Sequence, residues 1–444
     1  MRTRRFNHDT ACVGRRHGRT GVVGTVLMVV AIIASACSSS SKSATSAPTT
    51  SKGTQGTSAA GAAGTTTGAS GGDIVIGGVN YGANFPDTAT GFQARINRFN
   101  TTGGLNGRKI KFLGTTDDNG TVATDQSIVQ SLILNDHVIA LAPVNTTAFG
   151  PASSDFAAQN HTPFLSWSYL PNECGSQWSY GFNGCLVGSK VLNSSLEDPI
   201  ISVVGDPKKV RLAIQQNDNP SGISSETLFT KLITARGGQA VYAQANIPSS
   251  GTVDYTPYVQ AILKTNPNVV FLGTIFPQTV GISAALKAAG YKGLIQDYES
   301  YVPGLLAQQP AIASALQGQY VNTQVPPQES QSPAIKQMEM DLAAIGKPTQ
   351  ISISEQIGYW IGDVLVEMLQ ATAAAGRPLT GDGLYQTANS GTFTYTPRID
   401  GGVGPEKFPD AENNPSPCAG LVQVTGTQFK VVVPFKCYEN LPNQ

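Results

Sequence analysis

The sequence predicts an α/β protein made of two lobes, each a doubly wound parallel sheet with helices on both of its faces. Short apolar runs alternate with helical stretches from residue 73 onward, and this alternation occurs twice over stretches of similar length. Strand–helix–strand repeats of this kind place their strands side by side and parallel. Ligands bind beyond the carboxyl ends of such strands, so the repeat also predicts a ligand cleft between the lobes.

The first set of elements begins at residue 73 with a buried apolar strand. Its expected strands are 74–76, 109–113, a segment within 137–143, and 163–166, and its expected helices are 91–99, 124–135 and 148–159. Gly103 and Gly104 end the first helix, because glycine readily adopts the left-handed conformation that follows a helix. Asn106 and Gly107 then form a tight turn that leads into the second strand.

The second set of elements follows a pair of cysteines. Its expected strands are 210–214, 240–245, 269–273, 293–295 and 320–323, with helices at 225–236, 258–264, 279–289 and 305–316. Two longer helices are expected at 332–345 and 356–375. The tail from residue 392 is rich in turns and contains short β segments at 421–424 and 429–433.

The N-terminal 72 residues carry export signals. Six arginines precede an uncharged apolar run over 21–34, which is typical of a signal-peptide core and short for a membrane span. The segment Ala34-Ser35-Ala36-Cys37 resembles the lipobox of bacterial lipoproteins, whose cysteine is lipidated and becomes the new N-terminus. We therefore expect a signal peptide over 1–36 and a lipid anchor on Cys37 at the extracytoplasmic face of the cell membrane. Secretion by cleavage after Ala36, without lipidation, is the alternative.

A low-complexity segment separates this leader from the globular part. Residues 38–72 are almost entirely Ser, Thr, Ala and Gly, and such a composition buries too little apolar surface to offset the entropy of ordering. We therefore expect 37–72 to be a lipidated cysteine followed by a flexible tether.

The charge balance argues against nucleic acid as a partner. Six of the 29 basic side chains and one of the 29 acidic side chains lie in residues 1–36, so the net charge of the remaining chain is near −5. Binding to a phosphate backbone needs a basic surface, and none is indicated here.

Four cysteines remain after the leader and its lipidation candidate: Cys174, Cys185, Cys418 and Cys437. An exported chain with four cysteines suggests two disulfides. Proximity in sequence favours Cys174–Cys185 and Cys418–Cys437, although three connectivities are possible. A structural zinc site would need closely spaced cysteine pairs, which this set lacks, so no metal is expected.

Three motifs resemble those of the branched-chain amino-acid-binding family, the type I periplasmic solute-binding lipoproteins of ABC importers. The most specific is Gly-Gly-Leu-Asn-Gly-Arg-Lys-Ile at 103–110, between a helix and the second strand. The others are Gly-Thr-Val-Asp-Tyr-Thr-Pro at 251–257 and Leu-Lys-Ala-Ala-Gly-Tyr at 286–291. The likeness covers residues 73–433.

This resemblance implies how the chain is organised and what it does. The family has two lobes joined by three crossovers, which implies lobe one over 73–192 and 326–376 and lobe two over 193–325 and 377–444. It also implies that a small solute bridges the lobes, favours the closed state and is delivered to an ABC permease.

Polar and aromatic residues follow the strands of lobe one. The candidates are Tyr81 after the first strand, Asn145, Thr146 and Thr147 after the third, and Ser166, Trp167 and Ser168 after the fourth. In the resembling family, hydroxyls and backbone N–H groups of the last two loops hold the ligand carboxylate. Turn formation and helix capping are the alternative roles for the polar side chains. Trp167 is either a wall of the ligand site or a core residue.

Lobe two is expected to supply an anionic group to the cleft. The loop after its fourth strand contains Asp297 and Glu299, and the family places a carboxylate in this loop. Such a carboxylate pairs with a cationic ligand group through charge-assisted hydrogen bonds. A solvated loop acid is the alternative for either residue.

Two loops depart from the pattern of amino-acid-binding members. The loop at 217–222 lacks the usual tyrosine, and Ser168-Tyr169-Leu170 replaces the usual Ser-Ala-Thr run. An amino acid is the expected ligand, with an amide, a short peptide or an aromatic carboxylate as alternatives.

Enzymatic motifs are missing from the mature sequence. It contains two histidines, His137 and His161, and no HExxH motif, P-loop or complete GxGxxG. We therefore expect a binding protein that is not an enzyme and has no cofactor. A sensory receptor module of the same fold, or an envelope hydrolase, is the alternative.

Overall fold

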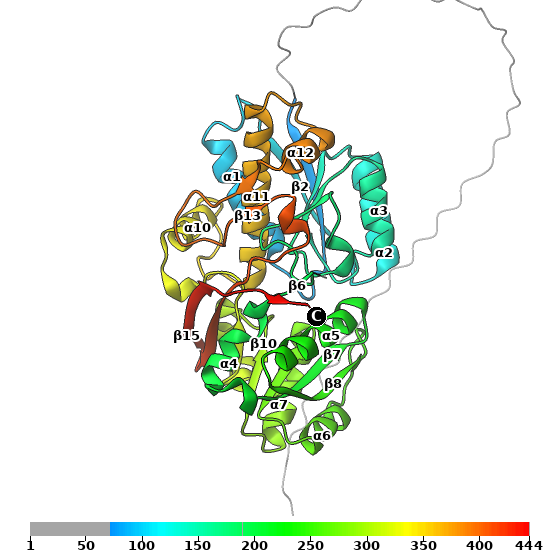
Figure 1. The fold of residues 1–444 in the computed structure, drawn as a ribbon. Coiled ribbons are helices and arrows are strands. Elements are labelled where there is room, and N and C mark those ends of the chain that lie inside the picture. The colour runs from blue at the N-terminus through cyan, green and yellow to red at the C-terminus, as the bar shows by residue number, and fades with distance from the viewer. Residues whose placement is uncertain (1–71, 189, 444) are drawn as a thin grey trace, which may run out of the picture. The chain divides into compact units, whose positions relative to one another are not determined.

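The computed structural model describes residues 72–188 and 190–443, which form two sheets flanked by helices (Figure 1). The expected signal peptide at 1–36, the lipidation candidate Cys37 and nearly all of the tether lie outside the described residues. Among the described helices, none is both long enough and apolar enough to cross a membrane.

The sheet of lobe one has the strand order β2-β1-β3-β4-β5, and all of its neighbouring pairs are parallel. Its strands are β1 (Ile74–Asn80), β2 (Ile110–Asp117), β3 (Ala140–Asn145), β4 (Phe164–Ser166) and β5 (Ser179–Gly181). Helices α1 (Thr88–Thr101), α10 (Pro333–Ala344) and α11 (Ile353–Ala374) lie on one side, and α2 (Val122–Leu134) and α3 (Pro151–Gln159) on the other (Figure 1). Each side has its own apolar core. The sheet is therefore doubly wound, as the sequence predicts.

The sheet of lobe two has the strand order β15-β14-β11-β10-β9-β7-β8. Its strands are β7 (Arg211–Asn217), β8 (Gln239–Ile247), β9 (Val269–Gly273), β10 (Leu294–Asp297), β11 (Tyr320–Asn322), β14 (Cys418–Thr425) and β15 (Gln428–Cys437). Its helices are α4 (Asp198–Val204), α5 (Pro220–Ala235), α6 (Thr256–Lys264), α7 (Phe276–Ala288), α8 (Pro303–Gln308) and α9 (Pro310–Leu316). The single helix expected at 305–316 is two helices, because Pro310 has no N–H to continue the first.

The C-terminal hairpin β14–β15 adds an antiparallel edge to this otherwise parallel sheet. Both disulfides favoured by sequence proximity are present, and the Cys418–Cys437 bond joins the open ends of this hairpin. A final two-stranded pair joins β16 (Leu441–Pro442) to β6 (Val191–Leu192). The last segment of the chain is therefore fastened to the region that leads into lobe two.

The chain passes between the two sheets three times: after β5, after β11 and before β14. Helix α12 (Gly381–Ala388) and the short strands β12 (Thr394–Tyr395) and β13 (Glu406–Lys407) precede the last passage. Tyr385 of α12 stacks on Trp178 beside β5, with ring centroids 4.3 Å apart. The Tyr395 hydroxyl donates to Asp363 of α11 at 3.0 Å. Residues 381–395 therefore pack against lobe one. This differs from the sequence-based expectation, in which lobe two resumes at residue 377 and includes them.

Close contact between α1 and α11 holds the site-bearing loops of lobe one. A Cβ atom on Gly358 would lie 1.9 Å from the Thr88 carbonyl oxygen, so only glycine permits this approach. The buried Arg95 Nε donates to Asp363 Oδ1 at 2.5 Å and ties the two helices together. Thr88 in turn accepts a hydrogen bond from the Asn145 side chain at 2.9 Å. The helix pair therefore fixes the end of β3, which lies close to the site.

Candidate functional site

A cavity of about 110 Å³ is lined by residues from both lobes. Lobe one contributes the loops after β1, β3 and β4, while lobe two contributes the ends of β7 and β9, the start of α5 and the loop after β10. The volume is many times what one water molecule needs, and it suits a small organic ligand. The cavity therefore lies where the sequence predicts, beyond the carboxyl ends of the strands.

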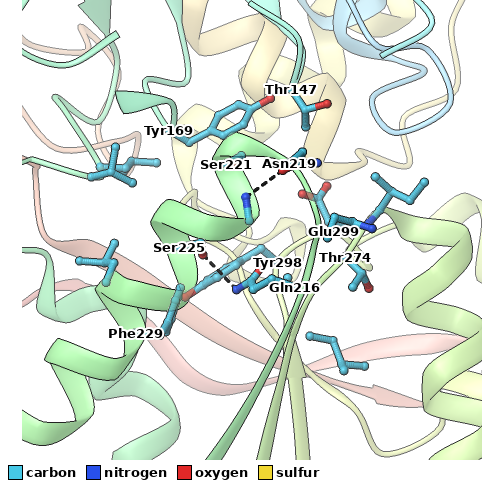
Figure 2. Close-up of a pocket in the computed structure, with 18 of the residues that line it drawn as sticks. Thr147, Tyr169, Gln216, Asn219, Ser221, Ser225, Phe229, Thr274, Tyr298 and Glu299 are labelled. Carbon is cyan, nitrogen blue, oxygen red and sulfur yellow. Dashed lines mark hydrogen bonds between the residues drawn. The ribbon is translucent and has the colours of Figure 1, made fainter. Parts of the chain in front are cut away.

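The lobe-two side of the cavity is largely apolar. Phe229 of α5 and Phe271 of β9 stack with ring centroids 4.0 Å apart, and Tyr298 meets Phe271 edge-on at 5.2 Å. Leu196 and Leu228 also line this part. In Figure 2, Phe229 and Tyr298 lie on the side opposite Thr147 and Tyr169. Such a compartment stabilises the apolar body of a ligand by removing its surface from water.

The lobe-one wall consists of three aromatic rings. Trp167 packs edge-on against Phe85 at 6.3 Å and against Tyr169 at 5.5 Å. Two polar atoms of this wall, Trp167 Nε1 and Tyr169 Oη, are buried and have no hydrogen-bond partner among the described residues. Buried donors without partners cost about 1–3 kcal/mol each, so they mark the positions at which a ligand acceptor would be favoured.

Polar side chains at the start of α5 are fixed by their own hydrogen bonds. Asn219 Oδ1 accepts from the Gly222 N–H at 2.8 Å, and Gln216 Nε2 donates to Ser225 Oγ at 3.1 Å (Figure 2). The first bond caps α5, whose N-terminus carries a partial positive charge. The edge of the cavity formed by the start of α5 therefore carries a partial positive charge, and no basic side chain of the described residues lines the cavity.

Asn84 connects the two lobes beside the cavity. Its Oδ1, in the loop after β1, accepts from the N–H of Phe276 at the start of α7, at 3.0 Å. The same side chain interacts with Glu299. A single residue of lobe one therefore bonds two loops of lobe two where both meet the cavity.

Glu299 is the acidic side chain that lines the cavity. Burial, and secondarily the charge of Asp297, raise its pKa to about 8, while the Asn84 hydrogen bond acts in the opposite direction. Its Oε2 is buried without a partner among the described residues. At neutral pH this group is therefore mostly a neutral carboxyl that is able to donate a hydrogen bond.

The structure places three of the nine predicted ligand residues in the cavity lining: Thr147, Trp167 and Glu299. The other six lie outside the lining: Tyr81, Asn145, Thr146, Ser166, Ser168 and Asp297. Tyr81 packs over Gly120, where a Cβ atom would lie 3.1 Å from its ring. Thr146 Oγ1 accepts a hydrogen bond from the Ala148 N–H at 3.0 Å, so this side chain stabilises a turn.

The remaining four predicted residues outside the lining are buried and hydrogen-bonded within their own lobes. Asn145 donates to Thr88, as described above. The hydroxyls of Ser166 and Ser168 lie 3.1 Å apart, and Ser166 Oγ also accepts from the Ser168 N–H at 3.0 Å. Asp297 accepts from the Ser300 N–H at 2.7 Å and from the Gln319 amide. These groups shape the loops that carry the cavity residues.

Three buried carboxyl groups lie behind the lobe-one loops. Burial raises the pKa of Asp118 to about 6 and those of Asp125 and Glu173 to about 7. Hydrogen bonds from Thr146, Ser153 and the Leu170 N–H, respectively, lower these pKa values in part. The loops of the site are therefore supported by acids whose pKa values lie much closer to neutrality than those of exposed carboxyl groups.

Most of the residues of lobe two that line the cavity are not predicted from the sequence. The sequence predicts Phe229 and Phe271 to be ordinary core residues of a helix and a strand. Their rings stack beside the cavity, which no local sequence pattern indicates. The loop at 217–222 was noted only for its missing tyrosine, although Asn219, Ser221 and Gly222 line the cavity. Their Asn-Pro-Ser-Gly sequence is a helix-start signal, which indicates a helix N-terminus at a strand end.

The periplasmic binding protein family model matches residues 77–428, which is most of the described chain. This chain belongs to the periplasmic binding protein family. No curated protein matches it in sequence.

Solved structures show the same fold at low sequence identity. A fatty acid ABC transporter substrate-binding protein from Thermomonospora curvata aligns with a TM-score of 0.70 at 17% identity, covering 83% of this chain and 93% of that one. A solute-binding protein of an ABC transporter from R. palustris, in complex with 4-hydroxybenzoate, gives 0.66 at 17% identity, with 84% and 98% covered. A leucine-binding protein from Thermotoga maritima gives 0.65 at 14% identity, with 83% and 99% covered.

Proposed function

We propose that this protein is the extracytoplasmic solute receptor of an ABC importer, binding one small ligand between its lobes and presenting it to a permease. The observation that carries the proposal is the cavity itself, which both lobes line, and whose lining residues Trp167, Tyr169 and Glu299 each have a buried polar atom without a partner in the described part of the chain. Family membership and the solute-binding proteins of similar fold support it.

The N-terminal segment completes the proposal. Cleavage before Cys37 and lipidation of its sulfur would anchor the protein to the outer face of the cell membrane, and the Ser/Thr/Gly/Ala segment up to residue 72 would let it reach the permease. A Cys37→Ser variant should then leave the membrane fraction, with its ligand binding unchanged. Retention of that variant in the membrane fraction would contradict the lipid anchor.

Hinge closure is the proposed binding mechanism. Ligand contacts with both lobes stabilise the closed state, which Asn84 already bridges through Phe276. No chemical step is proposed, since no histidine, cysteine or lysine of the described chain lines the cavity.

The decisive experiment is a thermal-shift screen of the purified chain against amino acids, amides, aromatic acids and fatty acids. A true ligand at 100 times its Kd should stabilise the folded state by about 2.7 kcal/mol and be recovered unchanged. Conversion of a stabilising compound into a product would contradict the receptor function, as would the absence of any stabilising compound.

A further inference from the structure

We propose, on the basis of the receptor function above, that the ligand is a small carboxylate or carboxamide with an apolar body about the size of one ring, and not a free amino acid. The shared chemistry is one planar head with an acceptor oxygen. Two observations indicate this class: some lining residues have polar atoms without hydrogen-bond partners among the described residues, and the lining contains a carboxyl group but no basic side chain of the described chain.

The head is assigned to the aromatic wall of lobe one. Trp167, which is 4% exposed, and Tyr169 both line the cavity, and the buried Trp167 Nε1 and Tyr169 Oη have no hydrogen-bond partner among the described residues. The two residues lie in the loop after β4, and their ring centroids lie 5.5 Å apart. A ligand acceptor group at this wall would supply the partner that such donors lack.

The charges of the lining disfavour a zwitterion. Among the described residues, no lysine, arginine or histidine lines the cavity, and Glu299 is the one carboxyl group in the lining. Glu299 lines the cavity, and its buried Oε2 has no partner among the described residues. In its neutral form this carboxyl can donate a hydrogen bond to a carboxylate or carboxamide oxygen, whereas an ammonium group needs it ionised.

The body is assigned to the lobe-two compartment. Phe229, Phe271 and Tyr298 form aromatic walls, with Leu228 beside them. Aromatic rings and branched aliphatic groups of small size fill such a space and are stabilised there by the removal of their apolar surface from water.

Calorimetric titration of the purified chain with benzoate, benzamide, leucine and phenylalanine tests the class. Benzoate or benzamide should bind at least tenfold more tightly than either amino acid, and comparing the two shows whether the head is charged. Tighter binding of leucine or phenylalanine would overturn the ligand class while the receptor function stands. If these four and the wider screen all fail to bind, both proposals fall.

Two variants test the assigned donors. Tyr169→Phe removes only the hydroxyl and should weaken binding of the preferred compound about tenfold, as loss of one hydrogen bond worth about 1.4 kcal/mol predicts. Trp167→Phe should weaken it similarly. The matched control is Tyr385→Phe, because the Tyr385 hydroxyl donates to Gln177 at 2.7 Å in an exposed position outside the cavity. Equal affinities for the Tyr169 and Tyr385 variants would overturn the assignment of the head.

Discussion

Replacement of the buried Asp125 by asparagine should change how the stability of the protein depends on pH. Asp125 lies in α2, is fully buried and accepts a hydrogen bond from the Ser153 hydroxyl of α3, while its Oδ1 has no partner among the described residues. Burial raises its pKa from the ordinary value of 3.8 to about 7, and the Ser153 bond offsets part of that effect. The folded protein therefore binds this proton more tightly than the unfolded chain does.

The sign and size of the effect follow from linkage. A carboxyl group whose pKa is higher in the folded state contributes stability that is fully present below pH 3.8 and is lost as the pH rises through about 7. Each pH unit between the two pKa values corresponds to about 1.4 kcal/mol, so the full contribution is about 4 kcal/mol. Roughly 3 kcal/mol of it should disappear between about pH 5 and pH 8.

Urea unfolding at pH 5 and pH 8 measures this loss. The Asp125→Asn variant, which cannot titrate at this position, should lose about 3 kcal/mol less than the natural protein between the two pH values. Asp155→Asn is the control, since Asp155 is an exposed aspartate on the same helix as Ser153. If the Asp125 and Asp155 variants show the same pH dependence, the argument that burial holds the proton on Asp125 is refuted.

Three further predictions concern the hairpin, the core beside the cavity and the bridge between the lobes. Replacing Cys418 and Cys437 with serine should lower the free energy of unfolding by about 3 kcal/mol, because the disulfide closes a loop between residues 19 apart; an unchanged urea midpoint would contradict this. Phe271→Ala should cost about 3–5 kcal/mol, since the side chain is 1% exposed and stacks on Phe229; a loss below about 1 kcal/mol would mean that the site collapses around the deletion. Asn84→Ala removes the hydrogen bond to the Phe276 N–H and should shift the protein toward an open state. We expect a larger radius of gyration in X-ray scattering and a several-fold weaker ligand affinity. Unchanged scattering and affinity would show that this bond does not hold the lobes together.

The sequence by itself determined the fold class and the position of the site along the chain. Apolar runs and helix signals are local, so the alternation of strands and helices could be read without the structure, and parallel strands then require ligand loops at their carboxyl ends. Proximity along the chain was also enough to favour the Cys418–Cys437 pair, which a two-stranded hairpin brings together. Thr147, Trp167 and Glu299 could be named because each follows a predicted strand.

Only the tertiary structure decided which side chains of those loops enter the cavity. Ser166 and Ser168 flank Trp167, yet Trp167 lines the cavity while the two serines bond each other, with Ser168 in the left-handed backbone region at φ 57°. A single backbone angle of this kind redirects a loop, and residue type does not reveal it when the residue is not glycine. The pairing of Phe229 with Phe271, and the packing of α12 against lobe one, likewise depend on contacts between distant parts of the chain. Local patterns carry no information about such contacts, because burial against a distant segment is a property of the whole fold.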